Sequence, residues 1–399
     1  MTERTAPATV ESMASKLPPD FPADPAPPNA TDSTDAVSEA VRRPYTLTAW
    51  REDLAAMREG VETKFPALAE VGMRWQPGRV YSVIARPGAG KTTFLLEACC
   101  RYLEADPSRH AVVLSWEEHL ADVVTSLLLR EDARADSPTG KAFANPVLFP
   151  RTVQQWGRRE TIDAAFSDRL RTAEQRLAPL LGRLHLIDGD RLGHTAQTVL
   201  AALAAWMRET GAPPIGLVAV DYFQKLTGDR ERSRQVELQG VADALRRFAK
   251  GARLSGELEQ ADTLAPRYAL PVLVGAQVNR TSANRENGTD GHPSGDDIRE
   301  ADDLLNDSAG VIALSWKPTE TTATGEEIRT LRLSVPKNRG GAVKADHVAG
   351  MLWRPARRFL APDALGALGR VQWSPLGGDT TGTKPKPAAG SPFVGDPNT

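Results

Sequence analysis

The 399-residue sequence has few of the residues that build disulfide frameworks or metal centres. Its only two cysteines, Cys99 and Cys100, are adjacent, which suits neither a disulfide framework nor a zinc site. The six histidines, at positions 110, 119, 185, 194, 292 and 347, lack the spacing of metal ligands. We therefore expect any metal to arrive together with a bound ligand.

Long apolar runs and a strong charge imbalance are also absent. No apolar run approaches the roughly 18 residues of a membrane span, and the opening MTERTAPATV is too polar for a signal peptide. A cytoplasmic protein without a membrane partner is expected. The net charge of -2 and the pI near 6.4 argue against a globally basic nucleic-acid coat. A local basic lining of a ring or cleft stays open.

Composition divides the chain into parts. Residues 1–45 and 377–399 are rich in small and polar residues and in proline, without apolar periodicity, which predicts disordered tails. Residues 46–75 are predicted to form a linker helix, Thr46 to Met57, and a lead-in segment. Residues 76–376 then form one large domain.

Apolar runs of strand length alternate with helical stretches in this domain. Strands are expected at Val80–Ile84, His110–Ser115, Leu184–Asp188, Ile215–Val220, Pro271–Ala276, Val311–Ser315 and Leu331–Val335. Intervening helices imply parallel crossovers, so the predicted fold class is α/β, with a mostly parallel central sheet and three layers. Ligand chemistry is expected at the carboxyl ends of the strands.

The stretch VIARPGAGKTTF, residues 83–94, joins the first of these strands to a helix that begins near Lys91. Its small residues let backbone N–H groups converge on phosphate oxygens, Lys91 reaches the β- and γ-phosphates, and Thr92 offers a hydroxyl to Mg²⁺. Ala85 stands where the usual pattern opens with Gly, but the flanking strand and helix support a phosphate-binding loop over an ordinary turn. We expect ATP and Mg²⁺ as cofactors. The expected nucleotide-binding residues are Arg86, Pro87, Gly88, Ala89, Gly90, Lys91, Thr92 and Thr93.

Three polar residues lie at or beyond the ends of other expected strands. Asp221 closes IGLVAV and suits a metal-binding carboxylate, with a turn-forming Asp as the alternative. Glu117 follows LSW and can orient and deprotonate a water molecule. Glu118 is a rival for this role, and an acidic pair that opens a helix often only complements the helix dipole. Gln277 ends PVLVGAQ, where its amide can report a γ-phosphate to the long polar loop Asn279 to Asp297, with a solvated connection as the alternative for that loop.

Several stretches occur together in one order: GVETKFPAL, IARPGAGKTTF, LSWEE, AVDYFQKL, GAQVNR, DDIREADDLLNDSAGVIAL and VPKNRGG. On these stretches, which span about residues 60–345, the chain resembles the ATPase domain of the DnaB-type hexameric replicative helicases, within the RecA-like group. The combination of DYFQ, AQVNR and KNRG is far more specific than a phosphate-binding loop alone.

The resemblance implies a RecA-like P-loop NTPase fold and roles within one subunit. Lys91 would bind phosphate, and Thr92 and Asp221 would hold Mg²⁺. Glu117 would be the catalytic base, and Gln277 the sensor of the γ-phosphate.

The resemblance also implies contacts beyond the subunit. Lys337 and Arg339 match a Lys-x-Arg pair that enters the neighbouring subunit's site in a homo-oligomer, a hexamer in this family. A solvated basic turn at Gly340-Gly341 is the alternative. Arg299 and Glu300 match the loop that contacts single-stranded DNA.

Three features depart from the family pattern. We expect the N-terminal helical domain, which docks primase and helps to form the ring, to be missing, with about 45 residues in its place. Asp302 stands where the family prefers Gly in the DNA loop, and an insertion runs from about Gly251 to Tyr268. ATP hydrolysis is therefore better supported than duplex unwinding.

Three functions stay open from the sequence. The first is an ATP-hydrolysing motor that translocates on single-stranded DNA, as a DNA helicase in replication. The second is a RecA-like ATPase that acts in recombination or on a partner without processive unwinding. The third is a nucleotide-gated assembly protein that binds no DNA. The basic stretch Arg230, Arg232 and Arg234 favours DNA, unless it is a solvated charge run.

Overall fold

The computed structural model describes residues 47–48, 51, 59–132, 150–209, 211–228, 233–251, 269–278, 302–316, 320–321, 327–353 and 358–360. The tails predicted at 1–45 and 377–399 lie outside these residues, as do nearly all of the insertion predicted at 251–268 and most of the linker helix predicted at 46–57. Leu47, Thr48 and Arg51 of that linker are helical. The proposed domain boundaries therefore remain predictions.

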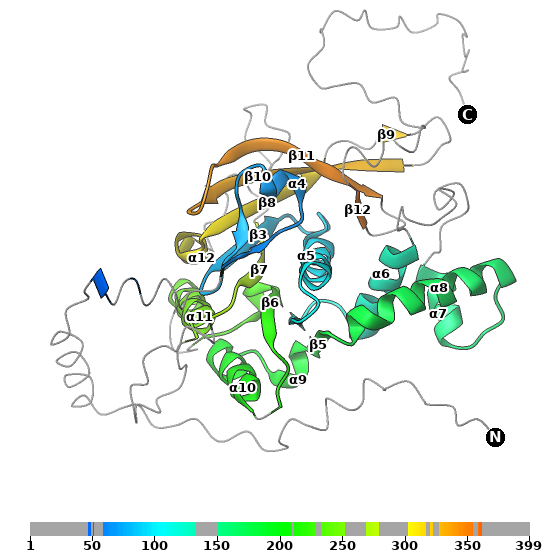
Figure 1. Cartoon of the computed structure of the whole chain (residues 1–399), viewed down its shortest axis with the longest axis horizontal. Helices are drawn as coiled ribbons and strands as arrows, with labels where there is room; N and C mark the ends of the chain where they lie inside the picture. The colour runs from blue at the N-terminus through cyan, green and yellow to red at the C-terminus, as the bar shows by residue number, and fades with distance from the viewer. Residues whose placement is uncertain are drawn as a thin grey trace, which may run out of the picture.

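A large mixed sheet forms the centre of the molecule (Figure 1). In spatial order its strands are β12 (Arg358–Leu360), β11 (Lys344–Trp353), β10 (Glu327–Asn338), β8 (Gly310–Trp316), β3 (Val80–Ala85), β7 (Val272–Gln277), β6 (Ile215–Asp221), β4 (His110–Ser115) and β5 (Leu184–Asp188). The strands from β8 to β5 pair in parallel. Strands β10, β11 and β12 extend the sheet antiparallel, and β9 (Glu320–Thr321) pairs with β10. A separate antiparallel pair consists of β1 (Val61–Glu62) and β2 (Arg74–Trp75).

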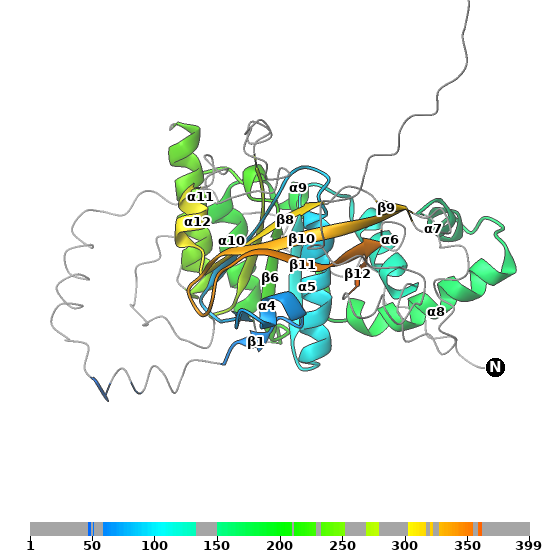
Figure 2. The ribbon, with the colours of Figure 1, turned by 90° about the horizontal axis from the view of Figure 1, so that it is seen from above.

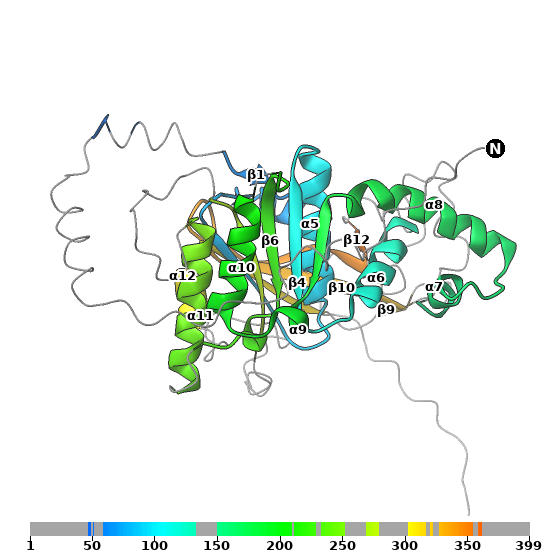
Figure 3. The same cartoon turned by 90° about the horizontal axis from the view of Figure 1, so that it is seen from below.

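Helices cover both faces of the parallel strands (Figures 2 and 3). One face carries α5 (Lys91–Ala105), α6 (Leu120–Asp132), α7 (Pro150–Gly157) and α8 (Ala164–Leu181). The other carries α10 (Ala196–Arg208), α11 (Arg234–Ala249) and α12 (Asp302–Asp307). Short elements complete the chain: α4 (Pro66–Ala69), α9 (Gly189–Leu192) and the 3₁₀-helix η1 (Phe223–Lys225). The predicted three-layer α/β fold is confirmed.

The apolar strands are buried because both of their faces meet a helix layer. In β3, Tyr81 and Val83 pack into the cluster on the α5 side, whereas Val80 and Ile84 pack into the cluster on the α11 side. All six residues of β3 are buried. A strand covered on both faces reads as a continuous apolar run, which is why the sequence locates it so well.

Each predicted strand is present at the predicted place in the sequence, but some strands differ in length from the prediction. His110–Ser115 and Leu184–Asp188 have the predicted bounds. The strand predicted at Leu331–Val335 extends over the whole of β10, and β11 and β12 were not predicted. Among the described residues, no helix combines the length and the apolarity that a membrane crossing requires.

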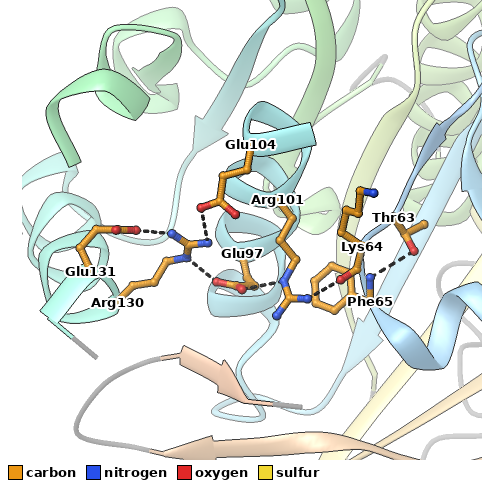
Figure 4. Close-up of polar contacts among 8 residues, drawn as sticks. All are labelled: Thr63, Lys64, Phe65, Glu97, Arg101, Glu104, Arg130 and Glu131. Carbon is orange, nitrogen blue, oxygen red and sulfur yellow. Dashed lines mark hydrogen bonds and ion pairs between the residues drawn. The ribbon is translucent and has the colours of Figure 1, made fainter. Parts of the chain in front are cut away.

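A network of ion pairs, here called the Arg130 network, fixes α5 against α6 and the lead-in segment (Figure 4). Arg130 of α6 pairs with Glu97 and Glu104 of α5 and with its neighbour Glu131. Arg101 also pairs with Glu97, at 2.7 Å, and donates to the Lys64 carbonyl. The network therefore holds the helix whose first turn carries Lys91 and Thr92.

Candidate active site

The loop between β3 and α5 places the start of a long helix at the tip of a central strand. Gly88 and Gly90 have φ angles of 74° and 87°, in the left-handed region that glycine adopts at little cost. Gly90 is the N-cap residue of α5, and the Ala89 N–H donates to the Arg86 carbonyl at 3.1 Å. The loop therefore forms a turn of the phosphate-binding type, with the positive end of the α5 dipole at its mouth.

The other expected loop residues differ in exposure. Pro87 and Gly88 are exposed, and Arg86, Thr92 and Thr93 are half-buried. Among the residues that the structure describes, the buried Arg86 Nε has no hydrogen-bond partner.

Lys91 is buried in the middle of the site. Its Nζ lies 3.3 Å from Glu117 Oε2, 3.7 Å from Asp221 Oδ1 and 4.5 Å from the centroid of the Tyr222 ring. A Cβ atom built at Gly275 of β7 would lie 2.9 Å from Lys91 Cε, so a side chain there would displace the lysine. Gly275 was not predicted as a site residue, although a glycine inside a strand indicates a close approach of another group.

Asp221 is positioned at the tip of β6 as a nearly enclosed carboxylate, with 1% of the residue exposed. Its Oδ2 accepts a 2.6 Å hydrogen bond from Thr92 Oγ1. Burial raises the pKa of Asp221, and the neighbouring Lys91 charge and Thr92 hydrogen bond oppose this rise. Within the described part of the chain, the buried Asp221 Oδ1 accepts no hydrogen bond. A carboxylate oxygen and a hydroxyl oxygen so placed fit Mg²⁺, a cation that prefers oxygen ligands.

Two adjacent carboxylates follow β4, and the ion pair with Lys91 comes from the first of them, Glu117. The turn that carries Glu117 is closed by Ser115, whose hydroxyl donates to the Glu118 carbonyl at 3.1 Å. The Glu117 side chain is 39% exposed. Glu117 thus combines access to water with a place beside Lys91, which a general base needs.

Gln277 lies at the end of β7, beside β3, and its backbone is held by a residue that sequence reasoning did not select. The Gln224 side chain accepts from Gln277 N at 3.1 Å and donates to Gln277 O at 2.8 Å. Arg234 in turn donates to the Gln224 carbonyl at 2.8 Å and pairs with Glu237 at 2.6 Å. The DYFQ stretch that carries Gln224 was the signal available in the sequence.

Lys337 and Arg339 lie near the amino ends of the parallel strands, whereas the phosphate-binding loop lies at their carboxyl ends. Asn338, between them, pairs with Gly310, and Gly310 pairs with Tyr81 near the start of β3. Lys337 Nζ donates to the Leu305 and Asn306 carbonyls at 2.6 and 2.8 Å. Arg339 is exposed, and its guanidinium donates to the Asn306 carbonyl at 2.6 Å. Both cations therefore contact the carboxyl end of α12 in the same chain.

The structure does not bring every predicted residue into view. Arg299 and Glu300, the predicted DNA contacts, lie outside the described residues, as do Arg230, Arg232 and the loop 279–297. Arg234 is described, and its guanidinium is bound within the chain. Burial and the charge of Arg339 lower the pKa of Lys337 from its ordinary value, which a freely solvated lysine would keep.

Lys91, Thr92, Glu117, Asp221 and Gln277 thus converge at the carboxyl edge of the parallel strands, as the sequence predicts. Among the described residues, no three His, Cys, Asp or Glu side chains form a metal site of their own. The arrangement suits a polyphosphate that brings a divalent cation with it. Cys99 and Cys100 are buried in α5, and burial raises the pKa of Cys100 to about 12.

Two protein-family models match the chain. Residues 50–256 match an AAA domain, and residues 181–352 match the DnaB-like helicase C terminal domain. Together the two matches include every described residue of the site. The first match alone covers more than half of the chain.

Two similar proteins are replicative DNA helicases. The replicative DNA helicase DnaB of Pasteurella multocida (strain Pm70) is 24% identical over 288 residues, which are 71% of this chain and 52% of that protein. The corresponding protein of Leifsonia xyli subsp. xyli (strain CTCB07) is 26% identical over 294 residues, 73% of this chain and 54% of that protein. This chain therefore spans about half the length of these relatives.

Solved structures share the fold at low identity. The solved ATPase domain of another protein has a TM-score of 0.57 and 16% identity, over 82% of this chain and 98% of that one. A DnaB-like replicative helicase, described with its interactions with primase, has a TM-score of 0.57 and 15% identity, over 82% and 71%. At these identities the likeness supports the fold alone.

Proposed function

Because the chain belongs to the family of DnaB-type helicase ATPase domains, we propose that it is an ATP-hydrolysing motor that translocates on single-stranded DNA. The observation that carries the proposal is the cluster of Lys91, Thr92, Asp221 and Glu117 around the phosphate-binding loop. Separation of duplex DNA in replication, within the cytoplasm, is the role that this motor fits best.

The residues of one subunit bind and prepare ATP. Lys91 turns from Glu117 to the β- and γ-phosphate oxygens, to which the N–H groups of the glycine-rich turn also donate. Thr92 and Asp221 would hold Mg²⁺, which when bound neutralises charge on the phosphate oxygens. Glu117, freed from its ion pair, accepts a proton from the attacking water. Gln277 reports the γ-phosphate to the segment beyond β7.

The site is completed by a neighbouring subunit. Lys337 and Arg339 lie at the edge of the sheet away from their own phosphate-binding loop, which supports their action in trans. An arginine supplied by a second chain is worth about 10³ to 10⁵ in rate in related enzymes. We therefore propose a homo-oligomeric ring, with six subunits expected from the family.

The DNA contact is assigned to Arg299 and Glu300, with the arginine on phosphate. Arg299→Ala should lower single-strand affinity for all sequences and reduce its salt dependence, because one phosphate contact is lost. Fluorescence anisotropy of a labelled oligonucleotide at several salt concentrations measures both. Binding curves equal to those of the wild type would remove Arg299 from the DNA interface.

The ATPase rate with and without single-stranded DNA tests the proposal as a whole. We expect Mg²⁺-dependent hydrolysis that single-stranded DNA accelerates, followed by unwinding of a forked duplex. Hydrolysis that DNA does not change would favour the nucleotide-gated assembly protein. Stimulation without unwinding would favour the RecA-like ATPase of recombination. Asp302, expected in the DNA loop, is the first residue of α12 in the structure.

The trans role of Arg339 can be tested by mixing two inactive variants. Lys91→Ala lacks an intact phosphate-binding loop, and Arg339→Ala lacks the arginine that a neighbouring subunit supplies. Some interfaces in the mixture then pair an intact loop with an intact Arg339. Part of the ATPase activity should return on mixing. Because closure of the ring depends on subunit contacts, sedimentation should also show larger species with a non-hydrolysable ATP analogue. Proven co-assembly without rescue at any ratio would show that Arg339 does not act in trans.

A further inference from the structure

Trp116 lies between the last residue of β4 and Glu117, and its indole packs directly on the backbone of α9. A Cβ atom built at Gly189 would overlap Cδ2 and Cε2 of the indole and lie 2.5 Å from Nε1. The Nε1–H donates to the Gly193 carbonyl at 3.0 Å. The ring thus contacts the first residue of α9 and bonds to the residue after its end, and Trp116 is only 5% exposed.

The surface beneath the indole is itself fixed. The Asp188 side chain accepts from Asp190 N at 3.1 Å and caps α9. Beyond α9, Thr227 N donates to the His194 carbonyl at 2.7 Å, and Ala196 N donates to the Thr227 carbonyl at 2.9 Å. These bonds tie α9 to the segment after β6, so the indole rests on a surface connected to the strand that carries Asp221.

The backbone of Trp116 also links β4, which precedes Glu117, to β6, which ends in Asp221. Trp116 N donates to the Asp221 carbonyl at 2.9 Å, and Ser115 holds the other side of the turn through Glu118. Glu117 lies between these fixed points. Once Lys91 turns to phosphate, the ion pair with Glu117 opens, and the turn must then hold the carboxylate in place. The anchor of that turn is the indole.

We propose that Trp116 and Gly189 form a positioning pair that sets the place of Glu117 for the attack of water. The inference rests on the proposed role of Glu117 as base. Trp116 acts through the turn and does not touch the nucleotide. Because Gly189 has no side chain, the backbone of α9 leaves room for the indole of Trp116, which fills that space.

Gly189→Ala tests the pair, because the methyl group must push the indole away. A displacement of about 1 Å at a reacting group can cost on the order of 10²-fold in rate, so we expect kcat to fall about 10- to 100-fold. The KM for ATP should change little, since Lys91 and Thr92 are on α5. The matched control is Gly240→Ala in α11, where a Cβ meets nothing within 4 Å; it should keep wild-type turnover.

Two further backgrounds separate positioning from simple damage to the core. In Trp116→Leu, which lacks the indole, adding Gly189→Ala should cost nothing more. In Glu117→Gln, which lacks the base, Gly189→Ala should also leave the residual rate unchanged. Equal losses of rate in all backgrounds would overturn the positioning role, as would wild-type kcat in a folded Gly189→Ala protein.

A variant that preserves an aromatic ring covers the case in which Gly189→Ala fails to fold. Trp116→Phe removes the hydrogen bond to Gly193 but adds no atoms, and it should lower kcat while KM stays constant. Wild-type kcat in Trp116→Phe would then overturn the proposal. If Glu117→Gln keeps wild-type turnover, the base assignment itself falls and the pair with it. If Glu117→Gln is inactive while Gly189→Ala and Trp116→Phe both turn over normally, the role of Glu117 stands and only the positioning role of Trp116 and Gly189 is overturned.

Discussion

Helix α5 takes part in two clusters of buried charge that differ in how completely they are satisfied. In the Arg130 network, three guanidinium nitrogens of Arg130 each donate to a carboxylate, and Glu97 accepts from two arginines. In the cluster around Lys91, Asp221 Oδ1 is buried 3.7 Å from Lys91 Nζ but accepts no hydrogen bond from any described residue. Both clusters contain buried charged groups, but only the first is closed by the protein itself.

The difference separates structure from function on physical grounds. A buried polar atom without a hydrogen bond costs about 1–3 kcal/mol, so a ligand that supplies the missing contact at Asp221 Oδ1 is favoured there. The Arg130 network has its charges paired and serves to join α5 to α6. In the Lys91 cluster, Asp221 Oδ1 is available to bind a cation, and it lies beside a loop whose turn suits phosphate. The Arg130 network thus fixes helix α5 in the fold, whereas the Lys91 cluster at the start of the same helix needs a ligand to complete its contacts.

Removal of the base should give the largest effect on the Lys91 cluster. Glu117→Gln keeps the shape of the side chain but cannot accept the proton, and general-base catalysis supplies about 10²- to 10⁴-fold in rate. We expect kcat to fall within this range while ATP still binds with Mg²⁺, as single-turnover and binding measurements can show. Glu118→Gln is the matched comparison. A larger loss in Glu118→Gln than in Glu117→Gln would identify the other carboxylate as the base.

Breaking the Arg130 network should affect stability instead. Arg130→Met removes the ion pairs that Arg130 makes with the buried Glu97 and Glu131 and leaves Glu97 paired with Arg101, and removal of one partner of a buried ion pair costs about 3–5 kcal/mol. Denaturant unfolding measures the loss, and turnover per folded molecule should remain near that of the wild type. The control is Arg171→Met, since both side chains of the Arg171–Asp168 pair are exposed and such pairs contribute about 0–1 kcal/mol. Similar losses in the two variants would show that the network does not hold α5.

A smaller effect should come from a pair of histidines at the far edge of the sheet. His110 Nδ1 and His185 Nε2 lie 3.0 Å apart, and burial together with His110 lowers the pKa of His185 from 6.5 to about 4. Between these two values the unfolded chain binds a proton that the folded chain does not, so the free energy of unfolding falls as the pH falls from 6.5 towards 4. His185→Gln should therefore lose less Tm than the wild type between about pH 7 and about pH 5. The exposed His119→Gln should behave as the wild type, and an unchanged pH dependence in His185→Gln would contradict the pKa shift.

The sequence predicts the parallel part of the sheet because its strands are short segments rich in apolar residues that are separated by helical stretches. It predicts the residues of the candidate site for the same reason, since the tips of neighbouring parallel strands meet at one edge. Val83 and Ile84 illustrate this pattern, with Lys91 a few residues beyond them. The antiparallel strands β11 and β12 were not predicted: β11 pairs with β10, and β12, only three residues long, pairs with β11.

The residues that sequence reasoning missed act through contacts distant along the chain. Gly275 matters only because Lys91 crosses it, and Gly189 only because the indole of Trp116 lies on it. Gln224 matters through the backbone of Gln277. The sequence can mark Gly275 and Gln224 as unusual, but it cannot identify the distant partner of each residue before the fold is known.

Binding of Mg²⁺-ATP, measured by titration calorimetry and followed by steady-state turnover, tests most directly whether the incomplete cluster is a nucleotide site. The wild type and the surface variant Lys250→Ala, at the end of α11, should bind and hydrolyse ATP alike. Lys91→Ala should lose turnover completely while its circular dichroism spectrum and Tm stay near those of the wild type. Unchanged turnover in a folded Lys91→Ala protein would show that the cluster around Lys91 is not the site of ATP hydrolysis.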